Sequence, residues 1–306
     1  MSEAMILLLF FTITLSFQPL GADPPEVPED EWFTETMNDG IDAYYRTDWD
    51  LAKNYFEKIK EKYPENPRPY FFESMMPFMR YFFIENSEEH AEEFLSTSEK
   101  ALELSHQQLE DVPTDTTMVL MLSGLYGYRG LVAAGQDRHQ IAIRSGLRGF
   151  QYTRKLLSLD SDRPDARIGK GMFYYMVGSV PDGMKWAVNM LGYSADKETG
   201  FNELKAAAQS DSYIRNDALM MLMYLYHKEE NLDQALYYAE KLTDSLPENL
   251  IFRYKKAKIL EEMGRLDEAI TIYNDVSSSN NLGFADLRDI SSDKARNLEK
   301  ITERSR

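Results

Sequence analysis

The sequence predicts an all-α fold, a superhelix (α-solenoid) of antiparallel helix pairs stacked along the chain. From Glu31 onward, apolar residues recur at three- and four-residue spacings, and no segment shows the sustained alternation of a β-strand. Pro, Gly, Ser and Asn interrupt this pattern at intervals that leave helices of about 12 to 20 residues. The sequence also repeats itself at a fixed period, which is typical of a helical repeat array.

The period is clearest near the C-terminus. A shift of 34 residues places Leu232-Asp233-Gln234-Ala235 on Leu266-Asp267-Glu268-Ala269. A further copy near the N-terminus ends in Tyr63-Pro64-Glu65-Asn66, and the same ending recurs as Leu246-Pro247-Glu248-Asn249. Copies in a common register predict repeated helix pairs at both ends of the chain.

These residues resemble the tetratricopeptide repeat, in which a small residue opens the second helix, an aromatic residue follows four positions later and a proline closes the unit. Ala52, Phe56 and Pro64 fill all three positions, and Ala269 and Tyr273 fill two. A small residue lets two helices approach closely, and the aromatic ring fills the space next to the following unit. The resemblance implies a protein that acts by binding rather than by catalysis.

The central units are degenerate copies. We expect helices at Tyr70–Ile84, Glu88–Leu109, 115–135, 137–159 and Asp165–Gly178, followed by an irregular stretch to Gly192 and a helix from Gly200. The order of a Gly-rich helix, DARIGKGMFYY, VPDG, LGY and GFNELKAAA resembles the tetratricopeptide-39/inclusion-body-clearance family and its bacterial relatives over residues 119–276. That resemblance implies helical-repeat interaction proteins without an established catalytic residue.

A Gly-rich helix is expected over Met118 to Ala134. Its glycines Gly124, Gly127 and Gly130 each cost about 1 kcal/mol of helix propensity relative to Ala. We expect close helix contacts to offset this cost, with the matching glycines on adjacent helices being Gly146, Gly149, Gly169 and Gly171.

The first 22 residues differ in kind from the rest. Met5 to Phe17 is an uncharged apolar run, shorter than the ~20 residues that span a bilayer and suited to a signal peptide. We therefore expect export to the periplasm or cell envelope, with an uncleaved membrane anchor and a buried first helix as alternatives. The expected organisation is a signal peptide at 1–22, an acidic Pro-rich linker at 23–30, a repeat domain at 31–283 and a C-terminal capping helix at 284–306. A basic amphipathic docking helix is the alternative for the last segment.

Charge is abundant and unevenly distributed. The chain has 51 acidic and 34 basic residues, a formal charge of -17 and no cysteine. This excludes disulfides and thiolate sites and argues against binding of nucleic acid by the whole surface. Residues 85–115 contain ten acids and one base, whereas residues 129–170 contain nine bases and four acids. The two segments either pair with each other, or the basic one receives an anionic ligand or an acidic peptide.

The first helix of each tetratricopeptide unit lines the concave groove, so the repeat register predicts which side chains a partner meets. Tyrosines are frequent at these positions, and tyrosine combines a rigid ring with a hydroxyl. The candidate partner-binding residues are Tyr44, Tyr45, Arg129, Arg167, Lys170, Tyr174, Tyr175, Tyr224 and Tyr254. Ordinary packing is the alternative role for each of them.

Enzyme signatures are poor. None of the four histidines, His90, His106, His139 and His227, has a second histidine at the spacing of a helical metal site, and Gly-x-Ser-x-Gly is absent. We predict no catalytic residues, no cofactor and no metal. The predicted function is a scaffold or adaptor of the cell envelope for a protein or peptide partner, with membrane proximity through the N-terminal segment. The alternative is a helical ligand-binding or enzymatic domain that uses the central basic and tyrosine-rich surface.

Overall fold

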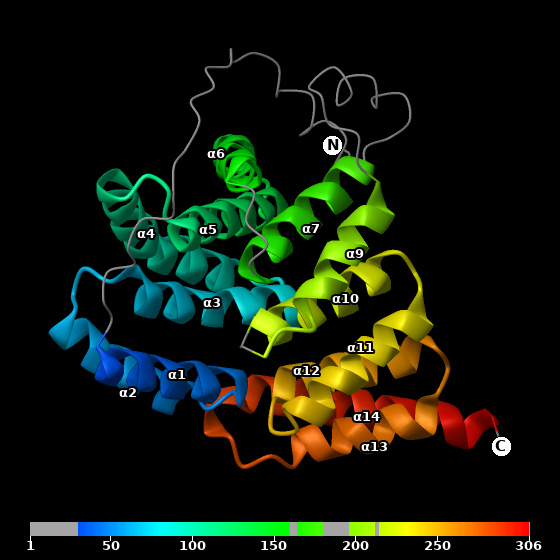
Figure 1. Cartoon of the computed structure of the whole chain (residues 1–306). Helices are drawn as coiled ribbons and strands as arrows, with labels where there is room; N and C mark the ends of the chain where they lie inside the picture. Colours follow the sequence, from blue (N-terminus) through cyan, green and yellow to red (C-terminus); the bar gives the residue numbers. More distant parts are fainter. Residues whose placement is uncertain (1–29, 160–163, 180–195, 212–213, 306) are drawn as a thin grey trace. The chain divides into compact units, whose positions relative to one another are not determined.

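The computed structural model describes residues 30–159, 164–179, 196–211 and 214–305, and all regular structure in these ranges is helical (Figure 1). Consecutive helices pack as neighbours, including α1 with α2, α5 with α6 and α12 with α13, which confirms the predicted all-α repeat architecture. The helices are α1 (Glu31–Tyr45), α2 (Trp49–Lys62), α3 (Pro67–Phe83), α4 (Glu88–Asp111), α5 (Thr116–Gly135), α6 (His139–Ser158), α7 (Pro164–Gly178), α9 (Lys197–Ala207), α10 (Ile214–Lys228), α11 (Leu232–Ser245), α12 (Leu250–Glu262), α13 (Leu266–Ser277), the short 3-10 helix η3 (Leu282–Phe284) and α14 (Ala285–Ser305).

The described residues form two compact units. Unit 1 contains residues 65–81 and 86–215, and unit 2 contains residues 31–64, 82–85 and 216–306. The first repeat therefore belongs to the same unit as the last two. A strictly linear array gives each repeat only its sequence neighbours as contacts, so this grouping was not predicted by the repeat register.

The repeat register itself is confirmed by burial. Ala52, Ala235 and Ala269 open their helices with no exposed surface, and the aromatic side chains of Phe56 and Tyr273 are likewise fully buried. These are the small and aromatic positions of the tetratricopeptide pattern. Each alanine lets its helix lie close to the preceding one, and each ring fills the space that remains.

The turns between paired helices also repeat. Glu230 and Gly264, which are 34 positions apart, both have positive φ, at 57° and 76°. A left-handed residue after the last helical turn reverses the chain and satisfies carbonyl groups that the helix leaves free. The second helices then begin at capping side chains: Asp48 accepts a hydrogen bond from the backbone N–H of Leu51, and Asn231 accepts one from that of Gln234.

Unit 2 is closed by hydrogen bonds between its first repeat and its C-terminal helices, which Figure 1 shows side by side. The Asn249 amide donates to the Tyr45 carbonyl at 2.6 Å, and the Asn281 amide donates to the Thr47 carbonyl at 2.8 Å. The Thr47 hydroxyl lies 3.3 Å from the Glu248 carbonyl. The polar groups of the α1–α2 turn are thus satisfied by residues some 200 positions later.

Unit 1 contains the Gly-rich packing. A Cβ at Gly149 of α6 would lie 3.1 Å from the Gly127 nitrogen of α5, and one at Gly130 would lie 3.4 Å from the Gly146 nitrogen. The predicted close approach of these two helices is confirmed. Gly171 of α7 instead meets α9, where a Cβ at Gly200 would lie only 2.6 Å from the Tyr175 nitrogen.

Helix α14 packs against α13 and buries Leu287, Ala295 and Leu298, while Ile301 near its end is 51% exposed. No helix in the described ranges is long and apolar enough to cross a bilayer. The predicted signal peptide at 1–22 and all of the predicted linker except Asp30 lie outside these ranges.

Candidate functional site

The nine predicted partner-binding residues fall into both units. Five belong to unit 1, namely Arg129, Arg167, Lys170, Tyr174 and Tyr175, and four belong to unit 2, namely Tyr44, Tyr45, Tyr224 and Tyr254. The structure therefore divides them into two groups, and each unit is described by itself.

In unit 1, the basic segment pairs with the acidic helix α4. The Arg129 guanidinium donates to the Leu95 carbonyl and to the Ser98 hydroxyl, and it lies 3.5 Å from a Glu99 carboxylate oxygen. Burial lowers the pKa of Arg129, an effect that Glu99 opposes. Arg138 pairs with Glu92 in the same way. For Arg129 and Arg138, this confirms the interpretation that the basic segment pairs with the acidic one.

The remaining unit 1 candidates lie on α7. Arg167 pairs at 2.9 Å with Glu203 of α9, which lies outside the acidic segment 85–115. The side chains of Lys170 and Tyr175 are buried, and the Tyr175 ring packs edge-on against Phe201. Tyr174 is half-buried. Arg167 and Tyr174 are therefore the more accessible of these α7 residues, and their contact with a ligand stays a prediction.

Three of the unit 2 tyrosines are buried. Tyr44 stacks on Trp49, Tyr254 lies 5.7 Å from the Tyr273 ring, and the Tyr45 hydroxyl donates to the Asp217 carboxylate at 2.5 Å. These contacts account for the three side chains as packing groups of unit 2. Tyr224 is half-buried, and its ring centroid lies 4.8 Å from that of Phe82.

Tyr224 belongs to a mixed polar surface on the first helices of the last two repeats. We define the α10–α12 face by Tyr224, His227, Lys255, Lys258 and Glu262. His227 and Glu262 join the two helices through a 2.6 Å contact between Nε2 and Oε2. Tyr224 and His227 lie three positions apart on α10, and Lys258 and Glu262 lie four positions apart on α12. Tyr224 is one of the predicted partner-binding residues.

Lys255 is the residue that sequence reasoning missed. A shift of 34 residues places it on Met221, whose side chain is 7% exposed. A lysine thus occupies a position where the preceding repeat buries an apolar side chain, and that substitution was visible in the aligned repeats. Its ammonium group lies 5.5 Å from the centroid of the Phe83 ring, a cation–π arrangement.

The surroundings of Lys255 disfavour the charged form of its amine. Burial, and to a smaller extent Lys258, lower the pKa of Lys255 to about 7, and Glu262 partly opposes both effects. Among the described residues, neither Lys255 nor Lys258 has a carboxylate within ion-pair distance. The α10–α12 face therefore has two lysines without a counter-ion in a chain whose net charge is -17.

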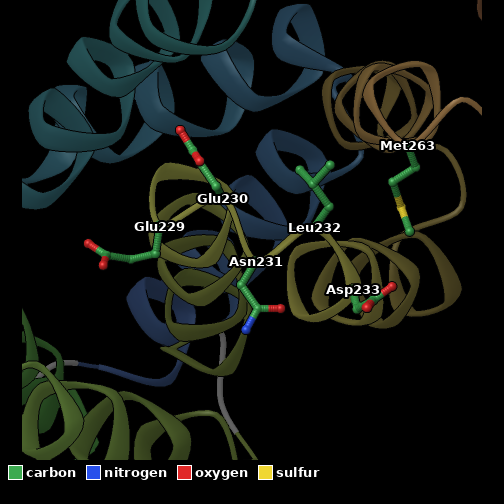
Figure 2. Close-up of a pocket in the computed structure, with 6 residues that line it drawn as sticks. All are labelled: Glu229, Glu230, Asn231, Leu232, Asp233 and Met263. Atoms are coloured by element: carbon green, nitrogen blue, oxygen red, sulfur yellow. The ribbon is translucent and has the colours of Figure 1, made fainter.

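A shallow depression of about 540 Å³ lies at the turn between α10 and α11, as Figure 2 shows. It is lined by Glu229, Glu230, Asn231, Leu232, Asp233 and Met263. The three carboxylates point away from one another, and the Asn231 side chain caps α11. Within the described ranges no group of His, Cys, Asp or Glu side chains could hold a metal ion.

One histidine cluster lies outside these surfaces. Both ring nitrogens of His106 are in hydrogen bonds, with the Tyr126 hydroxyl at 2.9 Å and the Tyr152 hydroxyl at 3.0 Å. Burial and then Arg148 lower the pKa of His106, which favours the neutral ring, in which one nitrogen donates and the other accepts. The cluster joins α4, α5 and α6 and has the geometry of a packing contact.

Comparison with known families agrees with this repeat architecture. The family model described as Iml2/Tetratricopeptide repeat protein 39 matches residues 165–283, and a tetratricopeptide repeat model matches residues 42–66. The first range includes the α10–α12 face, and the second includes the landmark residues Ala52, Phe56 and Pro64. No curated protein matched the chain.

Proposed function

We propose that this chain, a tetratricopeptide repeat protein that resembles the Iml2/tetratricopeptide repeat protein 39 family, is a non-catalytic scaffold of the cell envelope that binds a partner protein through the α10–α12 face. Tetratricopeptide repeats generally mediate contacts between proteins, and they generally do not catalyse reactions.

The observation that carries the proposal is the 2.6 Å contact between His227 and Glu262. It joins corresponding faces of consecutive first helices, which is the surface a superhelical array offers to a ligand. Around this contact lie Tyr224 and the two lysines, so the surface combines an aromatic ring with two basic groups that form no ion pair with other described residues. Such surfaces favour recognition, because aromatic anchors contribute affinity and charges select the partner.

Site-specific photocrosslinking in the native host tests the proposal. A photoreactive phenylalanine analogue replaces Lys258 on the α10–α12 face, and the matched control replaces Tyr237, which is 46% exposed on the second helix α11. We expect a discrete adduct from position 258 and none from position 237. The same adducts at both positions, or none at 258, would contradict binding through this face.

The place in the cell envelope rests on the apolar run Met5 to Phe17 and the small residues before Asp23. We propose that the chain is exported and cleaved after Ala22. Intact-mass analysis of protein from its own host should give a mature chain that begins at Asp23. A full-length chain in the cytoplasmic fraction would refute export, and a full-length chain in the membrane fraction would support an uncleaved anchor instead.

A further inference from the structure

We infer that the α10–α12 face selects a peptide segment with acidic side chains, and that Lys255 and Lys258 are the residues that recognise its carboxylates. This inference rests on the proposed function and names the chemistry of the partner. The occupant is an acidic segment of another protein, because two lysines that form no ion pair within the described part of the chain are complementary in charge to carboxylates.

Lys255 and Lys258 are close neighbours on α12. They lie three residues apart on α12, so their side chains share one face of the helix. Elsewhere on α12, Lys256 lies 3.9 Å from a Glu240 oxygen and Arg253 lies 3.1 Å from an Asp275 oxygen. The neighbouring bases of the same helix therefore have carboxylate partners, whereas Lys255 and Lys258 have none among the described residues.

An aromatic ring and two charged side chains surround Lys255. The Phe83 ring lies beside its ammonium group, Lys258 repels it, and Glu262 is engaged by His227 of α10. A half-buried amine without a counter-ion destabilises the folded chain in its charged form. An arriving carboxylate would supply the missing counter-ion, so binding and charging of Lys255 are coupled.

Tyr224 and Phe82 form an aromatic pair in unit 2. The rings of Tyr224 and Phe82 lie 4.8 Å apart, and both residues are half-buried. An aromatic side chain beside the acidic residues of the peptide can pack against these half-buried rings. A peptide with a phenylalanine flanked by glutamates is therefore a suitable probe.

Titration calorimetry with the full mature chain tests the inference. The probe is an amidated twelve-residue peptide with one phenylalanine among glutamates, and its matched peptide has glutamine at each glutamate. Measurements at pH 8 in two buffers of different ionisation enthalpy give the number of protons taken up on binding. Amidation removes the C-terminal carboxylate of the peptide, so only its glutamate side chains can pair with the lysines.

We expect the glutamate peptide to bind at least about tenfold more tightly than the glutamine peptide. Because the pKa of free Lys255 is about 7, the amine is mostly neutral at pH 8 and should take up close to one proton when a carboxylate pairs with it. Lys255→Gln should abolish this uptake and weaken binding. Lys255→Arg should bind without proton uptake, because a guanidinium is always charged.

Lys256→Gln is the matched control and should leave affinity and proton uptake unchanged, because Lys256 pairs with Glu240. Equal binding of both peptides, binding without proton uptake in the wild type, or full binding by Lys255→Gln would overturn the inference. A crosslinked partner at position 258 together with no affinity for the glutamate peptide would reject the acidic partner alone. Absence of both results would reject the proposed function as well.

Discussion

Asp217 and Tyr45 show how single residues combine packing with polarity inside unit 2. The Asp217 carboxylate is half-buried and accepts a hydrogen bond from the Tyr45 hydroxyl. Burial raises the pKa of Asp217 to about 6, and the hydrogen bond from Tyr45 opposes the rise. The folded chain therefore keeps the proton on Asp217 up to a higher pH than the unfolded chain does.

The raised pKa of Asp217 makes the free energy of unfolding depend on pH. Because the folded pKa lies above the unfolded value, unfolding releases a proton between pH 4 and pH 6, and stability falls as pH rises through this range. Asp217→Asn keeps an oxygen acceptor for Tyr45 and removes the charge. We expect it to raise the free energy of unfolding by about 1 to 3 kcal/mol at pH 8 and to have little effect at pH 4.

Denaturant unfolding of both chains at these two pH values measures the effect. Asp211→Asn is a suitable control, since Asp211 is exposed. An equal effect of Asp217→Asn at both pH values would show that the ionisation of Asp217 does not cost stability.

The tyrosines and Lys255 show how far the candidate site could be predicted from the sequence. The tyrosine pattern predicted partner-binding candidates, with packing as the alternative, and it could not distinguish a ring that meets solvent from one that other residues cover. Tyr45 and Tyr254 are buried, and the Tyr45 hydroxyl donates to Asp217, which lies 172 positions later. Lys255 was detectable in principle, since the repeat alignment places it on the buried Met221.

At the scale of helices, glycine contacts set the distance between paired elements. A Cβ at Gly200 of α9 would lie 2.6 Å from the Tyr175 nitrogen and 2.7 Å from the Gly171 oxygen of α7. Backbone atoms cannot move aside as a side-chain end can, so Gly200→Ala should separate the two helices. We expect a loss of about 1 to 3 kcal/mol in the free energy of unfolding.

Gly146→Ala is the matched substitution on α6. A Cβ there would meet no atom within 4 Å, so only the helix propensity changes. We expect a gain of up to about 1 kcal/mol, measured in the same denaturant series. Destabilisation of similar size by both substitutions would contradict the packing described for α7 and α9.

The helices themselves were largely predictable. The predicted segment Glu88–Leu109 corresponds to α4 at Glu88–Asp111, and Asp165–Gly178 corresponds to α7 at Pro164–Gly178. Apolar spacing and turn residues act locally, so they define helices without knowledge of the fold. The partner of Gly171 was not predicted, because a glycine marks a close approach without specifying which helix approaches.

At the scale of the whole molecule, the chain departs from a simple array by grouping its first repeat with its last. The amides of Asn249 and Asn281 satisfy carbonyls of the α1–α2 turn, and Trp49 lies 4.6 Å from the Phe284 ring. Repeat periodicity describes neighbours along the sequence and contains no information about contacts across some 200 residues. This closure protects apolar surface that a terminal repeat otherwise exposes.

The measurement that tests the central claim most directly is hydrogen exchange of the mature chain with and without saturating glutamate peptide. Binding through the α10–α12 face predicts slower exchange in Ile214–Lys228 and Leu250–Glu262, with α5, α6 and α7 unchanged. Protection confined to α5, α6 and α7, where Arg129, Arg167 and Tyr174 lie, would contradict the account and would favour a ligand site on the central surface of unit 1.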